Sequence, residues 1–220
     1  MAAIRFDTSQ LGHIRKIIDQ VPALRASIGE IARFKLVADA NFVIQELIHA
    51  VRCPNHGASA FEEMVKASVI EVFAPRWLET EMTIAISKAA KRSKVSEAAL
   101  RAKWTEFREL LKWDESLKEP DAGSTAFCDL KDHPYVLLEK KLRADGILTK
   151  DTDIARMGGH PLTHDFVFCT RNYARSAITT ASIQAISVVV PAAAGMVAAD
   201  LGRQSPSAVG RRAAREMLPR

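Results

Sequence analysis

The pattern of apolar and polar positions first changes clearly at residues 34–47. A short apolar run at residues 36–38 has the length of a strand, and Asp39 follows it directly. Apolar side chains then recur at helical spacing, at Phe42, Val43, Leu47 and Ile48. We therefore predict a strand, a sharp polar turn and a helix for this stretch.

The same order of patterns is found again further along the chain. Residues 69–73 alternate like a strand that stops at Pro75, and the apolar positions after it fit a helix. Another helix is expected to begin near Pro134 and to stop at Gly146, before a short strand at residues 147–149. Strand–helix units in series predict an α/β fold with a parallel sheet and crossover helices.

Carboxylates lie beside these strand ends and helix starts. Asp39 follows the first strand, Glu81 lies early in the next helix, Asp132 precedes the third helix, and Asp151 and Asp153 follow the last strand. Ligands bind at the carboxyl ends of strands in open parallel sheets, and carboxylate oxygens are preferred by Mg²⁺ and Mn²⁺. Each acid alone suits a turn, a helix cap or a solvated surface. Together, the four places indicate a metal site.

Four motifs in this order resemble those of the PIN-domain nucleases, a family that includes the VapC-like ribonucleases. They are Val37-Ala-Asp39-Ala-Asn41, Pro75-x-x-Leu78-x-x-Glu81, Asp129-x-x-Asp132-x-Pro-Tyr135 and Ile147-Leu-Thr149-x-Asp151-x-Asp153. The resemblance covers roughly residues 34–157. It implies a three-layer α/β/α sandwich around a central parallel sheet, and cleavage of RNA that depends on Mg²⁺ or Mn²⁺.

The resemblance also implies roles for the acids. Asp39, Glu81, Asp132 and Asp151 would form the catalytic quartet and bind the metal, and Asp153 would be a further ligand or an acid behind the ligands. A metal ion bound there would polarise the phosphate and lower the pKa of a bound water.

Neighbouring side chains would support this quartet. Asn41 and Thr149 would hydrogen-bond the carboxylates and orient them. Two acids have close rivals, Glu79 for Glu81 and Asp129 for Asp132. We favour Glu81 because it lies six residues after Pro75 and is followed by the apolar Met82. We favour Asp132 because it matches the second position of the family's motif.

The charge balance adds a weak pointer to anionic partners. The 220 residues carry a net charge of +5, and the pI is near 9.2, which favours binding to polyanions such as RNA. Basic side chains concentrate in a helical region at 88–112, where the candidate RNA contacts are Lys91, Arg92, Lys94, Arg101 and Lys103. The alternative for this region is a solvated helical arm.

Three parts are expected along the chain. Residues 1–33 form an N-terminal helical extension, 34–160 the nuclease-like domain with a basic helical insertion at 88–118, and 161–220 a C-terminal extension. Residues 176–199 contain no charged side chain, and about 20 apolar residues can span a bilayer. The alternatives for this segment are a buried strand, or a helix packed on a partner or on a second copy in a homodimer. The arginine-rich tail at 203–220 would meet RNA or anionic lipid.

Other features bound the setting. The three cysteines are widely spaced and give no disulfide framework, and the N-terminus has no apolar core of signal-peptide length. We expect a cytoplasmic protein, or one at the inner face of the membrane if 176–199 inserts. His160 and His164 are interpreted as structural, and Glu46 as a surface residue. Tyr173, between Arg171 and Arg175, is a candidate for stacking on nucleic acid.

Two functions stay open at this point. The first is a metal-dependent endoribonuclease; the resemblance implies a further role as a toxin paired with a cognate antitoxin protein, because many members of the family are such toxins. The second is a catalytically silent PIN-like module that binds RNA or a protein partner, with membrane association through 176–199.

Overall fold

The structure is a computed structural model that describes residues 20, 33–55, 57–120, 130–176 and 179. The chain divides into two compact units, Met1–Ala177 and Ile178–Arg220, and all elements below belong to the first. Its centre is a five-stranded sheet of β1 (Phe34–Ala38), β2 (Ile70–Pro75), β3 (Lys112–Asp114), β4 (Gly146–Leu148) and β5 (Pro161–Leu162). The strand order is β3-β2-β1-β4-β5 and every pair is parallel. The predicted parallel sheet is confirmed.

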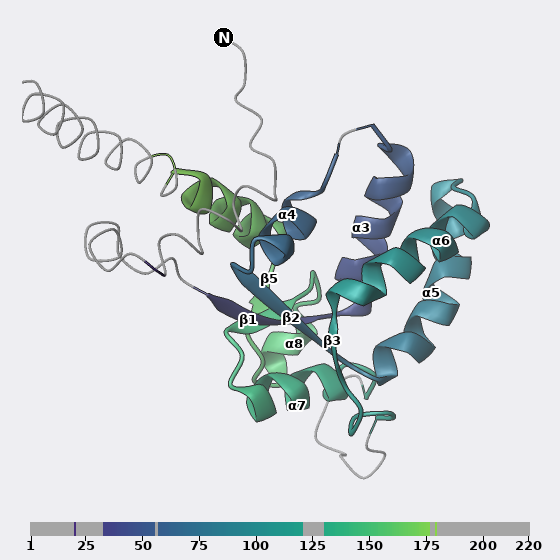
Figure 1. Cartoon of the computed structure of the whole chain (residues 1–220). Helices are drawn as coiled ribbons and strands as arrows, with labels where there is room; N and C mark the ends of the chain where they lie inside the picture. The colour runs from purple at the N-terminus through teal and green to yellow at the C-terminus, as the bar shows by residue number, and fades with distance from the viewer. Residues whose placement is uncertain (1–19, 21–32, 56, 121–129, 177–178, 180–220) are drawn as a thin grey trace, which may run out of the picture. The chain divides into compact units, whose positions relative to one another are not determined.

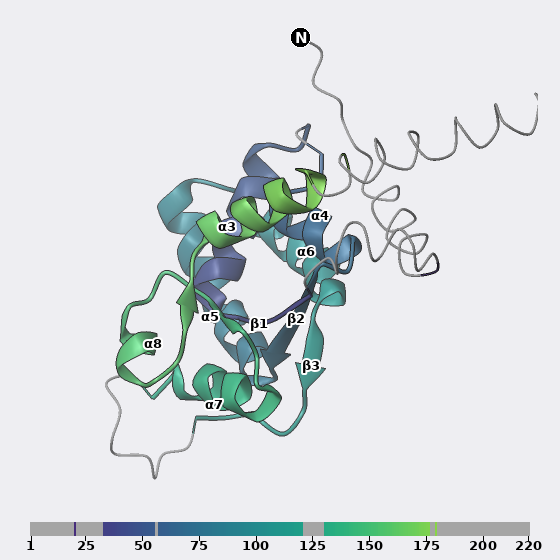
Figure 2. The ribbon, with the colours of Figure 1, turned by 90° about the vertical axis from the view of Figure 1, so that its left-hand side faces the viewer.

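Helices cover both faces of this sheet and make the predicted three-layer α/β/α sandwich. One side carries α3 (Ala40–Arg52), α4 (Ala60–Lys66) and α6 (Glu97–Phe107), and the other carries α7 (His133–Leu142) and α8 (Asp153–Arg156) (Figures 1 and 2). The long helix α5 (Trp77–Ser93) packs on α3 and α6, and α7 packs across β1, β2 and β4. Residues 164–176 are also helical.

The first strand lies at the centre of the core. Leu36, Val37 and Ala38 are fully buried, because β1 has a neighbouring strand on each side and helices on both faces. Such strands consist of continuous apolar residues rather than an alternation. This is why the run at residues 36–38 was visible in the sequence as a strand.

Local sequence explains where several helices begin. Ser59 forms a capping box with Glu62 at the start of α4, and Ser96 accepts a hydrogen bond from the Ala99 N–H at the start of α6. Pro134 lies in the first turn of α7, where its missing N–H costs nothing.

The predicted stop of this helix at Gly146 is wrong. Helix α7 ends at Leu142, and Arg143 takes the left-handed conformation that closes it. Gly146 instead begins β4, where it allows the backbone of the next strand to come close. A Cβ added there would lie 2.6 Å from Leu162 Cδ1 and 2.7 Å from the His160 carbonyl oxygen.

The region expected to be a basic helical insertion, 88–118, is only partly helical. It contains the end of α5, all of α6 and the short 3-10 helix η1 (Arg108–Leu110), but Lys112–Asp114 form the edge strand β3. This strand pairs with β2 in the register Phe73↔Lys112, so this part of the region belongs to the sheet. Its three residues include one apolar side chain, which is too little for a recognisable strand pattern.

Several predictions fall outside the described residues. These are the helices expected in 1–33 (apart from residues 20 and 33), the nature of the apolar segment 176–199 beyond its first residues, the tail at 203–220, and Asp129. Within the part of the chain that the structure describes, no helix combines the length and apolar character needed to cross a bilayer.

Candidate active site

Asp39 is placed at the carboxyl end of the central strand. It directly follows β1 and precedes the first residue of α3, and its backbone N–H donates to the Leu148 carbonyl of β4 at 3.1 Å. This hydrogen bond extends the pairing of β1 with β4 by one residue and fixes the Asp39 backbone beside the end of β4. The residue is only 2% exposed. A carboxylate is thus fixed inside the fold, at the edge of the sheet where parallel sheets bind ligands.

Thr149 holds the Asp39 carboxylate through its hydroxyl. Thr149 Oγ1 donates to Asp39 Oδ2 at 2.6 Å, and the same oxygen accepts a hydrogen bond from the Asp151 backbone N–H at 2.9 Å. Because the Asp151 N–H is the donor in the second bond, the hydroxyl hydrogen is free to point to Asp39. The predicted contact between Thr149 and the acids is therefore present, on Asp39.

Burial raises the pKa of Asp39 above its ordinary value. Hydrogen bonds from Thr149, from the side chain and backbone of Asn41, and from the Ala40 backbone act in the opposite direction without cancelling the effect of burial. Asn41 therefore contributes to holding Asp39, as the sequence predicts. A carboxylate with a raised pKa is one whose negative charge the protein does not fully compensate.

Two further predicted acids share a pocket with Asp39. Its volume is about 290 Å³, and its lining includes Asp39, Asn41, Trp77, Glu81, Lys88, Lys131 and Asp132. The three carboxylates come from different elements: the turn after β1, helix α5 and the start of α7. The fold thus brings these three acids, which are far apart in the sequence, to one place.

Tyr135 is buried close to these carboxylates and contacts one of them. It is fully buried, and its hydroxyl donates a hydrogen bond to Glu81. The pKa of Tyr135 is raised well above its usual value, first by burial and then by the negative charges of Glu81, Asp39 and Asp132. The tyrosine therefore stays a hydrogen-bond donor over the whole physiological range. The sequence motif contained Tyr135, but no role was assigned to it.

Asp151 and Asp153 are not part of the pocket lining. The Asp151 carboxylate accepts the Asp153 backbone N–H at 2.8 Å, and the Asp153 carboxylate pairs with Arg156 at 2.7 Å. These contacts form a tight turn that opens α8, so both side chains have local structural partners. Asp151 reaches the pocket only through its backbone, which donates to the Thr149 hydroxyl that holds Asp39.

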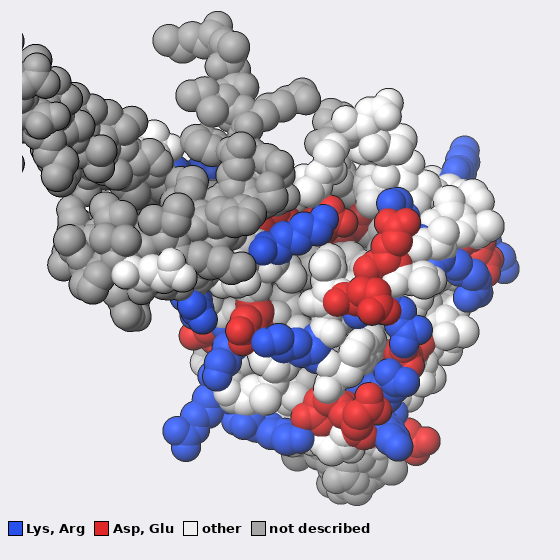
Figure 3. All heavy atoms as spheres, viewed as in Figure 1, with Lys and Arg blue, Asp and Glu red and all other residues white. Residues whose placement is uncertain are grey.

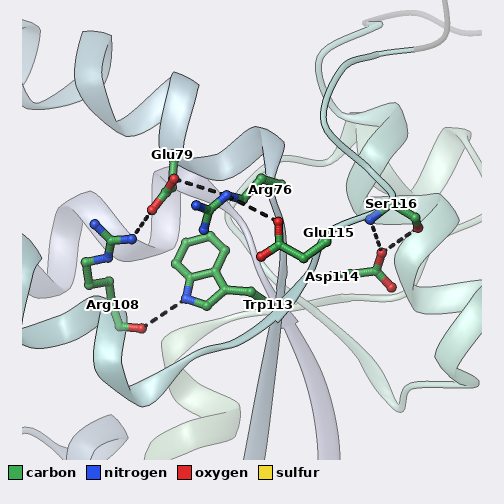
Figure 4. A network of polar contacts seen from close by, with 7 residues as sticks. All are labelled: Arg76, Glu79, Arg108, Trp113, Asp114, Glu115 and Ser116. Atoms are coloured by element: carbon green, nitrogen blue, oxygen red, sulfur yellow. Dashed lines mark hydrogen bonds and ion pairs between the residues drawn. The ribbon is translucent and has the colours of Figure 1, made fainter.

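Glu79, the rival of Glu81, points to a different region. It forms ion pairs with Arg76, at 3.3 Å, and with Arg108 (Figure 4). Both arginines also lie over the ring of Trp113 on β3. Of the two neighbouring glutamates, Glu81 is the one that lines the acidic pocket.

The predicted RNA contacts on α6 have acidic partners close by. Arg101 pairs with Glu97 at 2.7 Å, and Lys103 pairs with Glu106 at 2.6 Å. Figure 3 shows basic and acidic side chains interspersed on one face of the described residues, without a broad area of one sign. These two cations therefore stabilise their own helix, and neither lines the acidic pocket.

Two other lysines do line the acidic pocket. Lys88 lies seven residues after Glu81, two turns along the same face of α5, and Lys131 directly precedes Asp132. The helical spacing was available in the sequence but was not used. Of the remaining candidates, Arg92 lines a hollow between α3 and α5, together with Arg52. This hollow adjoins the acidic pocket, because Asn41, Ala85 and Lys88 line both. Lys91 and Lys94 lie at the end of α5, where Lys94 is the left-handed residue that closes the helix.

The donor atoms of the acidic pocket suit a hydrated magnesium or manganese ion. Among the described residues, no three His, Cys, Asp or Glu side chains lie close enough to hold one metal ion, so the expected cluster of four or five ligands is not assembled there. Magnesium, however, often binds through one or two carboxylates and keeps several waters. Asp39, with its uncompensated charge, and Glu81 or Asp132 beside it fit this requirement.

The interpretation of Glu46 as a surface residue is wrong. Its side chain is 10% exposed, and Glu46 Oε1 lies 3.1 Å from His164 Nε2. His164 also stacks on Phe42 of α3, with ring centroids 4.3 Å apart. The helix at 164–176 thus packs against α3 and covers Glu46, which no local pattern in the sequence reveals.

The other lone side chains have structural partners. His160 contacts the buried Glu139 at 2.8 Å, in agreement with its interpretation as structural. Arg175 forms two hydrogen bonds with the buried Glu63, at 2.8 and 2.6 Å. Tyr173, the residue predicted to stack on nucleic acid, is exposed. Its neighbour Arg175, however, is bound to Glu63 of α4.

No family model matches the chain, and no curated protein or solved structure matches it.

Proposed function

We propose that this protein is an endoribonuclease that depends on Mg²⁺ or Mn²⁺, as the resemblance to PIN-domain nucleases implies. The observation that supports the proposal most is the pocket shared by Asp39, Glu81 and Asp132. Three carboxylates around one small pocket repel one another, and a bound divalent cation would relieve this repulsion. The parallel sheet ends at this pocket, where ligand sites of such sheets are found.

Each part of the pocket has a task in this proposal. A bound metal ion would polarise the phosphate and lower the pKa of a coordinated water. Asp39 would hold the ion, and Thr149 keeps its carboxylate in one orientation. Tyr135 holds Glu81 by a hydrogen bond. Lys88 and Lys131 would place positive charge beside the phosphate oxygens of the substrate.

The pair Glu79 and Glu81 allows a sharp test, because both acids lie in the first turns of the same helix. Full-length protein is incubated with a labelled RNA in Mg²⁺ or in EDTA, together with Glu81→Gln and Glu79→Gln. We expect cleavage by wild type in Mg²⁺ only, a loss of at least about 100-fold in Glu81→Gln, and near wild-type cleavage by Glu79→Gln. Equal losses in both variants, or cleavage that EDTA does not affect, would contradict the proposal.

A second function is favoured by one specific observation. Among the described residues no three potential ligands are close enough for a single ion, which is what a catalytically silent PIN-like module would show. Such a protein would bind RNA or a protein partner without cleaving it. Saturable Mg²⁺ binding and RNA binding by the purified protein, with intact RNA after prolonged incubation, would favour this alternative.

The biological setting is also a proposal. As a toxin with a cognate antitoxin protein, the chain would arrest growth when expressed alone, and Asp39→Asn would relieve the arrest. Association with the membrane through 176–199 is tested by fractionating cells that express the full chain or a version ending at Arg175. Membrane recovery of the full chain only would support it.

A further inference from the structure

A second cavity shares no lining residue with the acidic pocket. Its volume is about 450 Å³, within the range of small-molecule sites in proteins. Its walls are formed by helix α3, the loop before α4 and the helix at 164–176, together with Lys150 after β4. Neither the acidic metal site nor the RNA contacts considered above use this cavity.

The charged side chains of this cavity favour an anion. Lys150 and Arg171 are the basic side chains that line it, and Glu46 is the one acid among its lining residues. Glu46 is already engaged with His164, at 3.1 Å. With neutral histidines the lining carries two positive charges and one negative charge, a net charge of +1.

Arg171 has hydrogen-bonding capacity that the described protein does not use. Its Nε atom is buried and has no hydrogen-bond partner, and the same holds for His164 Nδ1. Buried N–H groups are nearly always paired in folded proteins. A guanidinium group binds phosphate oxygens through two parallel hydrogen bonds. Arg171 lines the cavity, so an anionic ligand there would meet its guanidinium group.

An aromatic ring accompanies this guanidinium. Phe168 is 45% exposed, and Arg171 Cζ lies 5.2 Å from the centre of its ring. Phe168 also lines the cavity, so a ligand there would meet its ring. An exposed aromatic ring next to a cation is the combination that holds a base and its phosphate in single-stranded nucleic acid sites.

We propose that this cavity binds a nucleotide, with the phosphate on Arg171 and Lys150 and the base on Phe168. The nucleotide is either free in solution or one unit of an RNA chain. Lys150 directly follows Thr149, which holds Asp39, so an RNA chain bound here would pass close to the acidic pocket. The proposal does not depend on hydrolysis, because none of its three residues lines the acidic pocket.

Calorimetric titration of the full-length protein with AMP, in EDTA, tests this site. The variants are Arg171→Gln and Phe168→Leu, and the matched control is Lys112→Gln, which removes an exposed cation from the edge strand β3. We expect AMP to bind wild type, with at least about tenfold weaker binding in Arg171→Gln and at least about fivefold weaker binding in Phe168→Leu. Lys112→Gln and Asp39→Asn should bind like wild type.

Further titrations distinguish the source of the ligand and guard against misfolding. A 5′-phosphorylated RNA dinucleotide that competes with AMP would identify an RNA unit as a ligand, and AMP binding without such competition would identify a free nucleotide. Thermal melts confirm that each variant folds, and Lys150→Gln replaces Arg171→Gln if that variant does not. The proposal is overturned if millimolar AMP does not bind, if inorganic phosphate binds as tightly as AMP, or if Lys112→Gln weakens binding as much as Arg171→Gln.

Discussion

Two aspartates at the carboxyl ends of parallel strands differ in whether a cation pairs with them. Asp39 comes directly after the central strand β1, and Asp114 is the last residue of the edge strand β3. Lys141 pairs with Asp114 at 2.6 Å, and the Ser116 hydroxyl and N–H bind it as well. Asp39 is held by a hydroxyl and an amide, and within the described residues no cation forms an ion pair with it.

The pKa values of the two carboxyl groups move in opposite directions. Burial raises the pKa of Asp39, and its hydrogen bonds do not cancel this. Burial also acts on Asp114, but the hydrogen bonds from Lys141 and Ser116 together outweigh it and lower the pKa of that group. The charge of Asp114 is thus compensated inside the fold.

The acids near β3 share this compensation. Glu79 pairs with Arg76 and Arg108, and Glu115 lies 3.6 Å from Arg76 (Figure 4). A partner within the fold turns a carboxylate into a structural group. A buried carboxylate without a charged partner costs stability. Proteins keep such carboxylates mainly where a ligand or a reaction needs the charge. The comparison therefore separates the acids expected to act on a ligand from those that hold β3 in place.

The largest expected effect of this difference is on RNA cleavage. Asp39→Asn should reduce cleavage in Mg²⁺ by at least about 100-fold, because the uncompensated charge that would hold the metal is lost. Asp114→Asn makes the same chemical change at the other strand end and should retain activity within about threefold, measured at a temperature where both variants are folded. If both variants lose activity equally, position and surroundings do not distinguish the two acids.

The next effect concerns the hydroxyl that holds Asp39. Thr149→Val keeps the shape of the side chain but removes the bond to Asp39 Oδ2, and it should lower activity or metal affinity by about 10- to 100-fold. Thr83→Val is the matched control. That threonine is on α5, and its hydroxyl donates only to the Glu79 carbonyl one turn earlier. Kinetics at several Mg²⁺ concentrations should show a loss that excess metal partly restores in Thr149→Val and no loss in Thr83→Val.

The sequence predicted the elements whose patterns are local. Strand β1 is a continuous apolar run and β2 an alternating one that ends at Pro75, so both were recognisable without the structure. Strands β3 and β5 have three and two residues, and they exist as strands only through pairing with β2 and β4. Pairing between distant segments leaves no periodic pattern in a stretch of this length.

The predictions of the site also succeeded where the pattern is local and failed where the structure depends on contacts between distant segments. Asp39, Glu81 and Asp132 were predicted from strand ends and helix starts, and these three line one pocket. The sequence did not indicate that Asp151 would contribute its backbone, because that depends on how the turn before α8 folds. It also did not indicate the contact between Glu46 and His164, since only the packing of distant helices creates it.

A smaller effect is expected on stability when metal is added. A ligand that binds only the folded state stabilises it, by roughly 1.4 kcal/mol when the free metal is ten times its Kd. Wild type and Asp114→Asn should therefore show a higher melting temperature in Mg²⁺ than in EDTA, and Asp39→Asn should show little change. Sodium chloride at matched ionic strength controls for screening. An equal rise in all three proteins would indicate binding elsewhere.

The smallest expected effect is the pH dependence of stability in EDTA, and here the two aspartates should differ in sign. The pKa of Asp39 is higher in the folded protein than in the unfolded chain, so its charge lowers stability as the pH rises through the folded pKa. Replacing it with Asn should raise the melting temperature at pH 7, and the gain should vanish below the unfolded pKa, at about pH 3.8.

Asp114 has the opposite linkage. Its folded pKa is lower than its unfolded one, so its charge contributes stability above the unfolded pKa, and this contribution is lost as the pH falls through the folded pKa. Asp114→Asn should therefore lower the melting temperature at pH 7 and have less effect in acid. Thermal melts of both variants and wild type from pH 3 to pH 8 measure the two curves. If Asp39→Asn also lowers stability at pH 7, then the Asp39 charge is compensated in the folded protein, and the distinction between a ligand-binding acid and a structural one fails.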